Sequence, residues 1–342
     1  MKVRVYVVDD SAISRECLRD VLEAGGTIEV VGEAGDASVA LREIPALAPD
    51  VVTMDLHMPA MGGLEAIERI MASSPVPILV VTERPTSAGT DVVFEATRRG
   101  ALDLAAKTGD PRSAAGEHLR TLVARLAKVP VVHHVAAPKL RGMDVGVRRG
   151  APGGRPDVVG VGASAGGPSA LVELLAPLAG VGACFAVVQH LPEGFTEGFA
   201  RYLGQATRLR VVVANVPVPL APDVVVVAPD GAHLVASGSK LAPEVGPPVA
   251  GHRASVDVLF HSLSRVFAAR AAGVLLSGIG RDGAQGLLAM RRAGARTFAQ
   301  DEASSAVYGM PLAAFEAGAA EEVLAPRAIA ARLASFMGKA IA

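Results

Sequence analysis

The chain has 342 residues, and at about 150 residues per domain this length predicts two domains. Hydrophobic residues make up 51% of the sequence, which is enough for two buried cores and excludes disorder as the main state. The 33 Lys and Arg residues balance 34 Asp and Glu residues, so the formal net charge of -1 provides no overall basic field, and we expect no nucleic acid partner.

The cysteines and the hydropathy pattern favour a cytoplasmic protein. Cys17 and Cys184 lie far apart in the sequence, which suits a reducing compartment and predicts neither a disulfide nor a metal cluster. We expect both to be small core residues. No secretory signal pattern is present, and no apolar run approaches the ~18 to 20 residues that span a bilayer. The sequence therefore predicts no direct membrane insertion.

The first third of the chain alternates short Val- and Ile-rich runs with longer Ala-, Leu- and Arg-rich stretches. This alternation is typical of β-α units around a parallel sheet. It predicts an α/β domain over residues 1–127, doubly wound and five-stranded, whose last helix opens at Pro111. The expected strands are 3–8, 28–31, 51–54, 78–81 and 102–106.

A linker and a second domain follow. Residues 128–156 are rich in Pro, Gly and basic side chains, which predicts a linker. From residue 157 a second alternation predicts another doubly wound, mostly parallel α/β domain over 157–342, of Rossmann-like form. Within it, residues 217–249 are rich in Pro, Gly and Val with little helical period, and we expect a small antiparallel edge there.

Polar side chains follow the predicted strands of the first domain. Asp9 and Asp10 follow the first strand, Asp55 the third, Thr82 the fourth and Lys107 the fifth. The carboxyl ends of parallel strands meet at one edge of the sheet, where ligands bind. Three carboxylates repel one another unless a cation lies among them, which predicts Mg²⁺ held by Asp10 and Asp55 with Asp9 nearby. Lys107 would supply a positive charge for a phosphoryl oxygen.

The acidic residues belong to two longer motifs. These are Val-Val-Asp-Asp-Ser at 7–11 and Met-Asp-Leu-His-Met-Pro at 54–59, followed by Gly-Gly at 62–63. Residues 1–127 therefore resemble the flavodoxin-like receiver domain of two-component response regulators. The resemblance implies phosphorylation of Asp55 and Mg²⁺ held by Asp9, Asp10 and Asp55, with Thr82 and Lys107 contacting the phosphoryl group. Gly62, Leu104 and Thr108 stand where the family commonly has Asp, an aromatic switch residue and Pro.

The glycine-rich segment around Ser164 has two interpretations. Gly160-x-Gly162-x-x-Ala165 matches a dinucleotide-binding fingerprint, whereas Gly162-x-Ser164-x-Gly166 matches a turn that exposes a nucleophilic serine. A dinucleotide site requires an acidic residue at the end of the next strand, and that strand, 184–188, leads instead into Gln-His. A histidine there favours a hydrolase, because a serine nucleophile needs a general base.

A third strand, predicted at 273–277, leads to a loop that contains Asp282. Ser164, His190 and Asp282 can therefore converge at one edge of the sheet as nucleophile, base and orienting carboxylate. Their chain order is Ser, His, Asp, which differs from the Ser, Asp, His order of α/β-hydrolases and disfavours that superfamily.

Other histidines compete for the role of base. His261 falls within a helix predicted over 256–267, where we expect it to be structural. His233 and His252 follow Gly-rich loops, and their sequence positions leave both open as the base.

Five segments of the second domain resemble the catalytic domain of chemotaxis protein-glutamate methylesterases, the CheB family. They are 162–168, 189–191, 255–260, 278–284 and 299–311. The resemblance implies that Ser164 is the nucleophile, His190 the base and acid and Asp282 the orienting carboxylate. It also implies an oxyanion donor at the backbone N–H of Ile279. Ala165 stands where the family commonly has Thr, and Ser-Gly-Ile at 277–279 replaces Thr-Gly-Met.

The two resemblances together imply a phosphorylation-regulated esterase with no cofactor in its catalytic domain. Its substrates would be methylated glutamates of methyl-accepting chemotaxis receptors, and its phosphodonor the chemotaxis histidine kinase. Some relatives also deamidate receptor glutamines. Two alternatives are a phosphorylation-dependent regulator without turnover and a related ester hydrolase of a non-chemotaxis chemosensory pathway. The resemblance further implies that the receiver domain obstructs the catalytic domain until Asp55 is phosphorylated.

Overall fold

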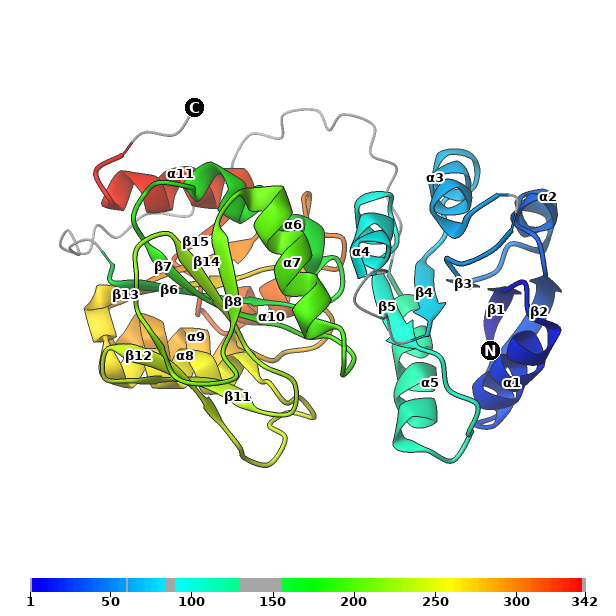
Figure 1. The fold of residues 1–342 in the computed structure, drawn as a ribbon, viewed down its shortest axis with the longest axis horizontal. Helices are drawn as coiled ribbons and strands as arrows, with labels where there is room; N and C mark the ends of the chain where they lie inside the picture. The colour runs from blue at the N-terminus through cyan, green and yellow to red at the C-terminus, as the bar shows by residue number, and fades with distance from the viewer. Residues whose placement is uncertain (1, 60, 84–89, 130–155, 340–342) are drawn as a thin grey trace. The chain divides into compact units, whose positions relative to one another are not determined.

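The computed structural model describes residues 2–59, 61–83, 90–129 and 156–339 (Figure 1). The chain divides into two compact units, Met1–Val135 and Ala136–Ala342. Nearly all of the predicted linker at 128–156 lies outside the described residues.

The first unit is a five-stranded parallel sheet in the order β2-β1-β3-β4-β5. Helices α1 and α5 pack together on one face, and α2, α3 and α4 lie along the other (Figure 1). The expected five-stranded α/β fold is therefore confirmed. The elements are β1 (Val3–Val8), α1 (Ala12–Glu23), β2 (Ile28–Ala34), α2 (Ala37–Leu47), β3 (Val51–Met54), α3 (Gly63–Ser73), β4 (Ile78–Thr82), α4 (Thr90–Arg98), β5 (Asp103–Ala106) and α5 (Ala114–Leu126).

The start of α5 differs from the sequence prediction. Pro111 does not open the helix, which begins at Ala114 after the N-cap residue Ser113. The Ser113 hydroxyl accepts a hydrogen bond from the backbone N–H of Gly116 at 3.0 Å, which satisfies one of the free amides of the first turn. A hydroxyl cap two residues after Pro111 thus decides where the helix starts, over the preference of proline for a first turn.

The second unit is built on a seven-stranded parallel sheet in the order β15-β14-β13-β6-β7-β10-β8. Helices α6, α7 and α11 pack on one face, and α8, α9 and α10 on the other (Figure 1). The strands of this sheet are β6 (Val158–Ala163), β7 (Cys184–Gln189), β8 (Arg210–Val213), β10 (Val224–Val227), β13 (Ala271–Leu275), β14 (Arg296–Gln300) and β15 (Glu322–Leu324). The helices are α6 (Gly167–Leu175), α7 (Thr196–Thr207), α8 (Val256–Val266), α9 (Ala284–Arg292), α10 (Met310–Glu316) and α11 (Pro326–Phe336), with 3-10 turns η1 (Ala176–Leu178) and η2 (Ala268–Arg270).

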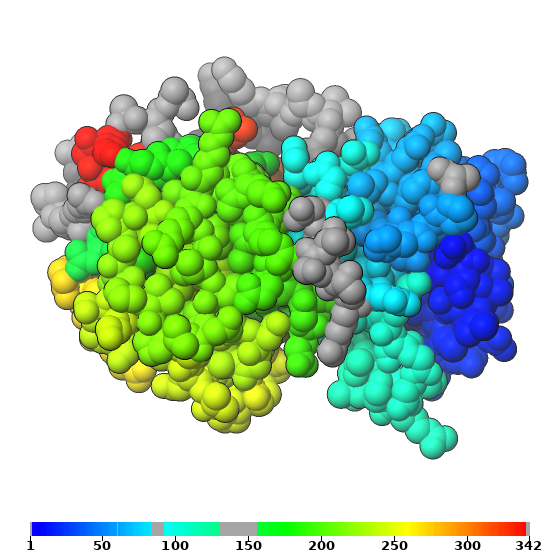
Figure 2. Space-filling model, viewed as in Figure 1, coloured from blue at the N-terminus to red at the C-terminus, as the bar shows by residue number. Residues whose placement is uncertain are grey.

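The antiparallel strands expected within 217–249 are present as a sheet of their own. Strands β9 (Val218–Pro219), β11 (His233–Ser237) and β12 (Lys240–Glu244) pair in the order β11-β12-β9, whereas β10 joins the parallel sheet. The hairpin packs on α8, where the N–H of Ala236 donates to the Ser262 hydroxyl at 2.9 Å. It therefore covers the helix layer and does not extend the sheet edge. Figure 2 shows this yellow-green segment at the surface of the unit.

The cysteines, the bounds of β13 and the lengths of the helices bear on three further sequence predictions. Cys184 is buried, as expected, but Cys17 on α1 is only half-buried, and neither thiol is in a disulfide. Strand β13 begins and ends two residues before the predicted 273–277. Within the described residues, none of the helices has the length and apolar character required to cross a membrane.

In each parallel sheet the chain order reverses at the first strand of the unit. In the first unit β1 lies between β2 and β3, and in the second unit β6 lies between β7 and β13. Loops that leave the carboxyl ends of such neighbouring strands diverge in opposite directions and open a crevice between them. Residues that follow β1 and β3, or β6, β7 and β13, therefore lie in the most probable ligand positions of the two folds.

Strand β6 approaches α8 so closely that only glycine fits at position 162. A Cβ atom on Gly162 would lie 2.2 Å from Cγ1 and 2.8 Å from Cγ2 of Val256. Val256 is fully buried at the start of α8, so its side chain has no free space into which it could rotate. The close contact holds the first turn of α8 beside the end of β6.

We predict that Gly162→Ala destabilises the protein by about 1–3 kcal/mol, because the added methyl group overpacks this contact. Gly204→Ala on α7 is the matched control: its Cβ would meet no atom closer than 3.6 Å. Alanine at this helical position should stabilise the protein by about 0.5–1 kcal/mol. Urea unfolding of both variants tests this, and equal effects of the two substitutions would contradict the close packing.

Candidate active sites

Three carboxylates meet at the carboxyl ends of β1 and β3. Ligand oxygens of Asp9, Asp10 and Asp55 all lie within 4.8 Å of one another, and Asp10 is exposed whereas the other two are buried. Oδ1 of Asp9 accepts a hydrogen bond from the N–H of Ser11 at 3.0 Å, and Oδ1 of Asp55 accepts one from the N–H of Leu56 at 2.8 Å. Local backbone amides thus orient the two buried carboxylates.

Lys107, at the end of β5, neutralises part of this charge. Its Nζ lies 2.7 Å from Oδ2 of Asp9 and 3.0 Å from Oδ2 of Asp55. Partial burial lowers the pKa of Lys107, but the hydrogen bonds and charges of the two aspartates raise it by more, so the pKa lies above its ordinary value. The ammonium group is therefore held in its charged form beside the cluster.

The arrangement fits both a hard cation and a phosphoryl group. Carboxylate oxygens are the ligands that Mg²⁺ prefers, and the exposed Asp10 leaves one side of the cluster open to solvent. Nearby, the hydroxyl of Thr82 is buried and has no hydrogen-bond partner in the described part of the chain. A buried hydroxyl without a partner is costly unless a ligand completes it. The structure therefore brings together all five residues that the sequence predicted for this site.

In the second unit, sheet register places Ser164 beside His190. Ala163 at the end of β6 pairs with Gln189 at the end of β7, and the N–H of His190 donates to the carbonyl of Ala163 at 3.0 Å. Ser164 and His190 are the residues that follow this pair on the two strands. On its other side, the N–H of Ser164 donates to the carbonyl of Ser277, which follows β13, at 3.0 Å.

The turn after Ser164 depends on glycines. Gly166 has a φ of 72°, in the left-handed region, whereas Ser164 itself is not left-handed. In this respect the turn differs from the strained serine of a nucleophile elbow. A Cβ on Gly278 would lie 2.8 Å from Cβ of Ser164, so the loop after β13 reaches the serine only because that residue is glycine.

Asp282 is almost completely buried at the amino end of α8. One of its oxygens, Oδ1, accepts hydrogen bonds from the Ser255 hydroxyl at 2.8 Å and the N–H of Asp257 at 3.1 Å. The other, Oδ2, accepts from the N–H of Val256 at 2.7 Å and lies 2.9 Å from Nε2 of His190. A carboxylate at a helix amino terminus is also favoured by the helix dipole.

These contacts keep Asp282 ionised. Burial raises the pKa of Asp282, but the hydrogen bond and charge interaction with His190 and the N–H groups of Val256 and Asp257 lower it by more, to about 2. The carboxylate therefore carries its negative charge throughout the physiological pH range.

The contact with Asp282 determines which nitrogen of His190 is available for proton transfer. An ionised carboxylate accepts hydrogen bonds only, so Nε2 carries the proton that is donated to Asp282. In the neutral ring, Nδ1 then has a free lone pair. This atom is buried and has no hydrogen-bond partner among the described residues, Ser164 included. In unliganded sites such hydrogen bonds are often long and shorten when substrate binds.

The competing histidines take other positions. His233 is buried on β11, with Nε2 3.0 Å from the carbonyl of Pro247 and Nδ1 accepting from the N–H of Ser255 at 3.1 Å, so both nitrogens are occupied. His261 is exposed on α8. The ring of His252 lies parallel to that of His190, with the ring centroids 3.7 Å apart. Among the histidines considered for the base, His190 alone contacts Asp282.

The backbone N–H of Ile279 lies in the loop that passes Ser164. Its neighbour Gly278 lies against Ser164. Within the described residues this N–H donates no backbone hydrogen bond, whereas the N–H of Gly278 donates to the carbonyl of Val307 at 3.1 Å. The structure thus leaves an unused amide donor near the serine.

Two residues to which the sequence motifs assigned no role support the site. The Nε2 amide of Gln189 donates to the carbonyls of both Ser164 and His190, at 2.8 and 3.0 Å. Ser255 caps α8 and donates to Asp282. A serine before an apolar helical run is a recognisable cap, so its place could have been predicted. The contacts across the sheet could not, because no short motif connects these positions.

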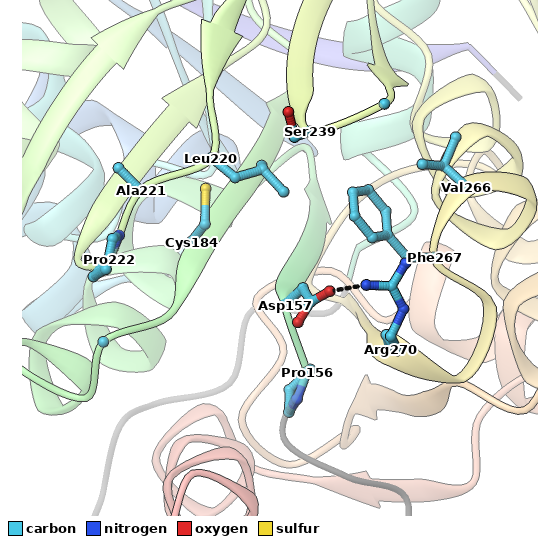
Figure 3. A pocket seen from close by; sticks show the side chains of 12 residues that line it. Pro156, Asp157, Cys184, Leu220, Ala221, Pro222, Ser239, Val266, Phe267 and Arg270 are labelled. Atoms are coloured by element: carbon cyan, nitrogen blue, oxygen red, sulfur yellow. Dashed lines mark hydrogen bonds and ion pairs between the residues drawn. The ribbon is translucent and has the colours of Figure 1, made fainter.

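A pocket of about 560 Å³ lies at the opposite end of the second sheet (Figure 3). Its lining includes residues that precede or begin strands of this sheet, namely Asp157 before β6, Cys184 at the start of β7 and Arg270 before β13. Asp157 and Arg270 form an ion pair there (Figure 3). Because Ser164 and His190 follow the carboxyl ends of the strands, this pocket is separate from their site.

Two family models match the chain. The model of CheB methylesterases matches residues 159–333, and the model of response regulator receiver domains matches residues 5–115. Both resemblances stated from sequence motifs are therefore confirmed.

Individual proteins give the same result. The chain is 45% identical over 328 residues to protein-glutamate methylesterase/protein-glutamine glutaminase 2 of Anaeromyxobacter dehalogenans. The aligned residues cover 94% of this chain and 93% of that protein. It is 42% identical to a protein-glutamate methylesterase/protein-glutamine glutaminase of Caulobacter vibrioides, with 94% of each chain covered. The crystal structure of the Thermotoga maritima CheB methylesterase catalytic domain matches with a TM-score of 0.50 and 29% identity, over 53% of this chain and 98% of that one.

The low pKa of Asp282 predicts a pH-dependent contribution to stability. A carboxyl group whose pKa falls from 3.8 to about 2 on folding stabilises the folded state by about 2 kcal/mol above pH 5. This contribution is present above the unfolded-state pKa and is lost as the pH falls through the folded-state pKa. Asp282→Asn should therefore lower the free energy of unfolding by about 2 kcal/mol at pH 7 and by roughly half as much at pH 3.

Urea unfolding at the two pH values measures the effect. Glu193→Gln, which removes an exposed carboxylate, is the control and should leave the free energy of unfolding unchanged. A difference between wild type and Asp282→Asn that is the same at pH 7 and pH 3 would contradict the ionised, hydrogen-bonded carboxylate.

Proposed function

The chain belongs to the CheB methylesterase family, and we propose that it hydrolyses the γ-methyl esters of glutamate side chains in methyl-accepting chemotaxis receptors. We further propose that Ser164 is the nucleophile, His190 the general base and acid, and Asp282 the carboxylate that orients His190. The observation that carries the assignment is the hydrogen bond between Asp282 and Nε2 of His190. His190 is also the residue that lies beside Ser164 in the register of β6 and β7.

The reaction is acyl transfer through a serine ester. Oγ of Ser164 attacks the γ-carbonyl carbon while Nδ1 of His190 takes the hydroxyl proton. The tetrahedral intermediate collapses, the bond to the methoxy oxygen breaks, and methanol leaves with the proton from His190. A water molecule then gives one proton to His190 and attacks the acyl carbon. Collapse of this second intermediate breaks the bond to Oγ of Ser164, which takes the proton back from His190, and the glutamate product loses its acid proton to solvent.

Two charges that form during the reaction have partners in the site. The imidazolium of His190 lies beside the ionised carboxylate of Asp282, which the amino end of α8 holds in place. The oxyanion of the intermediate would accept a hydrogen bond from the backbone N–H of Ile279. Because this donor is a backbone group, the replacement of the family's usual methionine by isoleucine leaves it intact.

The same residues suit the hydrolysis of a glutamine amide. The leaving group is then ammonia, and His190 supplies the proton that an amine requires. The relatives named above carry both activities in their names. We therefore propose receptor glutamine deamidation as a second reaction of this site. No step of either reaction uses a cofactor in the second unit.

We propose that the first unit is a phosphorylation-controlled regulator of the second. Asp55 would accept a phosphoryl group from the chemotaxis histidine kinase. Asp9, Asp10 and Asp55 would hold Mg²⁺, which neutralises the phosphoryl oxygens during transfer when it is bound. Lys107 and the unpartnered hydroxyl of Thr82 would contact the phosphoryl oxygens.

Phosphorylation would favour the substrate-accessible state of the enzyme by a population shift between two states that differ in their affinity for the phosphoryl group. The switch would act without an aromatic residue at position 104, where this chain has a buried leucine. The two unpaired cysteines favour the cytoplasm as the compartment. We propose domains at 1–127 and 157–342, joined by the linker at 128–156.

Two alternatives are weighed against this function. A phosphorylation-dependent binding protein without turnover would have no need of a buried carboxylate paired to a histidine, and such pairs are costly unless they serve a purpose. A related ester hydrolase of a non-chemotaxis chemosensory pathway would use the same catalytic residues on another substrate. Methanol release from methylated receptor, compared with release from small methyl esters, separates these cases.

We predict that Ser164→Ala lowers the rate of methanol release from methylated receptor at least 10³-fold, because the nucleophile is lost. Ser264→Ala, which removes an exposed hydroxyl from α8, is the matched control and should retain full activity. Both variants should have the wild-type melting temperature. Near-normal hydrolysis by Ser164→Ala would exclude this serine as the nucleophile.

We predict that a small phosphodonor labels the wild-type chain at Asp55 and raises its methylesterase activity. The acid-labile label should be absent from Asp55→Asn and from wild type treated with a metal chelator, since both the acceptor and the cation are required. Asp20→Asn, an exposed aspartate on α1, is the control and should label normally. Full labelling of Asp55→Asn would place the phosphoryl group elsewhere.

A further inference from the structure

We propose that His252 is a positioning residue that holds the ring of His190 in the orientation required for proton transfer. This inference rests on the proposed function, in which His190 is the base. The two imidazole rings are stacked, with centroids 3.7 Å apart and an angle of 1° between their planes. Contact over the full ring face at this distance is close packing, and it restricts both the tilt and the rotation of His190.

The backbone presents His252 at a fixed place. The N–H of His252 donates to the carbonyl of Val249 at 2.9 Å, and the N–H of Val249 donates to the carbonyl of His252 at 3.0 Å. The turn between them contains Ala250 and Gly251, both with left-handed φ values. Three residues after His252, Ser255 caps α8 and donates to Asp282. His252 is thus attached to the same helix terminus that holds the carboxylate.

The hydrogen bonds of His190 leave one motion of its ring unconstrained. The hydrogen bond from Nε2 to Asp282 fixes one edge of the ring, and Gln189 fixes the backbone carbonyl of His190. Neither contact fixes the plane of the ring, because a single hydrogen bond allows rotation about its own axis. Nδ1 of His190, the atom that must face the Ser164 hydroxyl, has no partner in the described structure to set its direction. The stacked ring of His252 supplies this missing constraint.

The stack also serves the charged form of the base. When His190 takes the proton of Ser164 it becomes a flat cation, and an aromatic face against a cation is stabilising in a partly dry site. The contact requires a planar ring at position 252 and does not require that this ring exchange a proton. The proposal therefore separates His252 from a second base, because phenylalanine would preserve the first property and remove the second.

The experiment compares His252→Phe with His252→Ala in the full-length chain. His252→Phe should keep kcat for methanol release within about threefold of wild type. His252→Ala should lower kcat by about 5- to 30-fold, the size of a lost cation–ring contact, with KM unchanged. The rate at which a fluorophosphonate labels Ser164 should fall in parallel in His252→Ala. His261→Ala, which removes an exposed histidine from α8, is the control and should leave both rates unchanged.

Other outcomes overturn the inference. Wild-type kcat in His252→Ala would show that stacking does not orient the base, and equal losses in the Phe and Ala variants would show that a nitrogen of His252 is needed instead. A lower melting temperature in His252→Ala but not in His252→Phe, with restored kcat at low temperature, would assign His252 a structural role only. Ser164→Ala, measured in parallel, tests the proposed function separately: full activity in that variant would reject the nucleophile whatever His252 does.

Discussion

The buried negative charge of Asp282 is the constraint around which the second unit is arranged. A carboxylate in this environment would cost several kcal/mol if its oxygens lacked partners. Its partners come from the amino end of α8, from the Ser255 cap and from His190 at the end of β7. Satisfying one charge therefore fixes the position of a helix, the loop after β13 and the ring of the histidine together. The close contact of Gly162 with Val256 keeps that helix terminus at the strand end.

The first unit uses the same electrostatics for a different purpose. Its three carboxylates face one ammonium group, so the cluster retains more negative than positive charge. Lys107 contacts Asp9 and Asp55 but leaves Asp10 exposed to solvent. In the second unit every oxygen of the buried carboxylate is already occupied by a protein donor. One site is thus complete in itself, whereas the other has capacity for a cation and an anion that arrive from solution.

The sequence predicts the strands and the residues that follow them better than it predicts contacts between distant segments. Apolar runs identify β1 and β3, and the carboxyl-end rule then brings Asp9 to Asp55 and Ser164 to His190 before any coordinates are known. The choice among the histidines could not be made in this way. His233 and His252 both follow glycine-rich loops, and only the folded chain shows that one is tied to Pro247 while the other stacks on His190. The predicted start of α5 at Pro111 was wrong, because the Ser113 cap outweighed the preference of proline for the first turn of a helix.

Backbone contacts explain how the proposed catalytic site keeps its shape where its side chains depart from the family pattern. Ser277 is fully buried; its hydroxyl donates to the carbonyl of Ala165 at 2.7 Å and accepts from the N–H of Val307 at 2.9 Å. The turn that carries Ser164 is therefore held through the carbonyl of residue 165, and a threonine side chain there is not needed for this contact. A hydroxyl is needed at 277, and serine provides it as well as threonine would. The departures at these two positions thus leave intact the hydrogen bonds between the turn that carries Ser164 and the loop after β13, because those bonds use groups that the substitutions do not change.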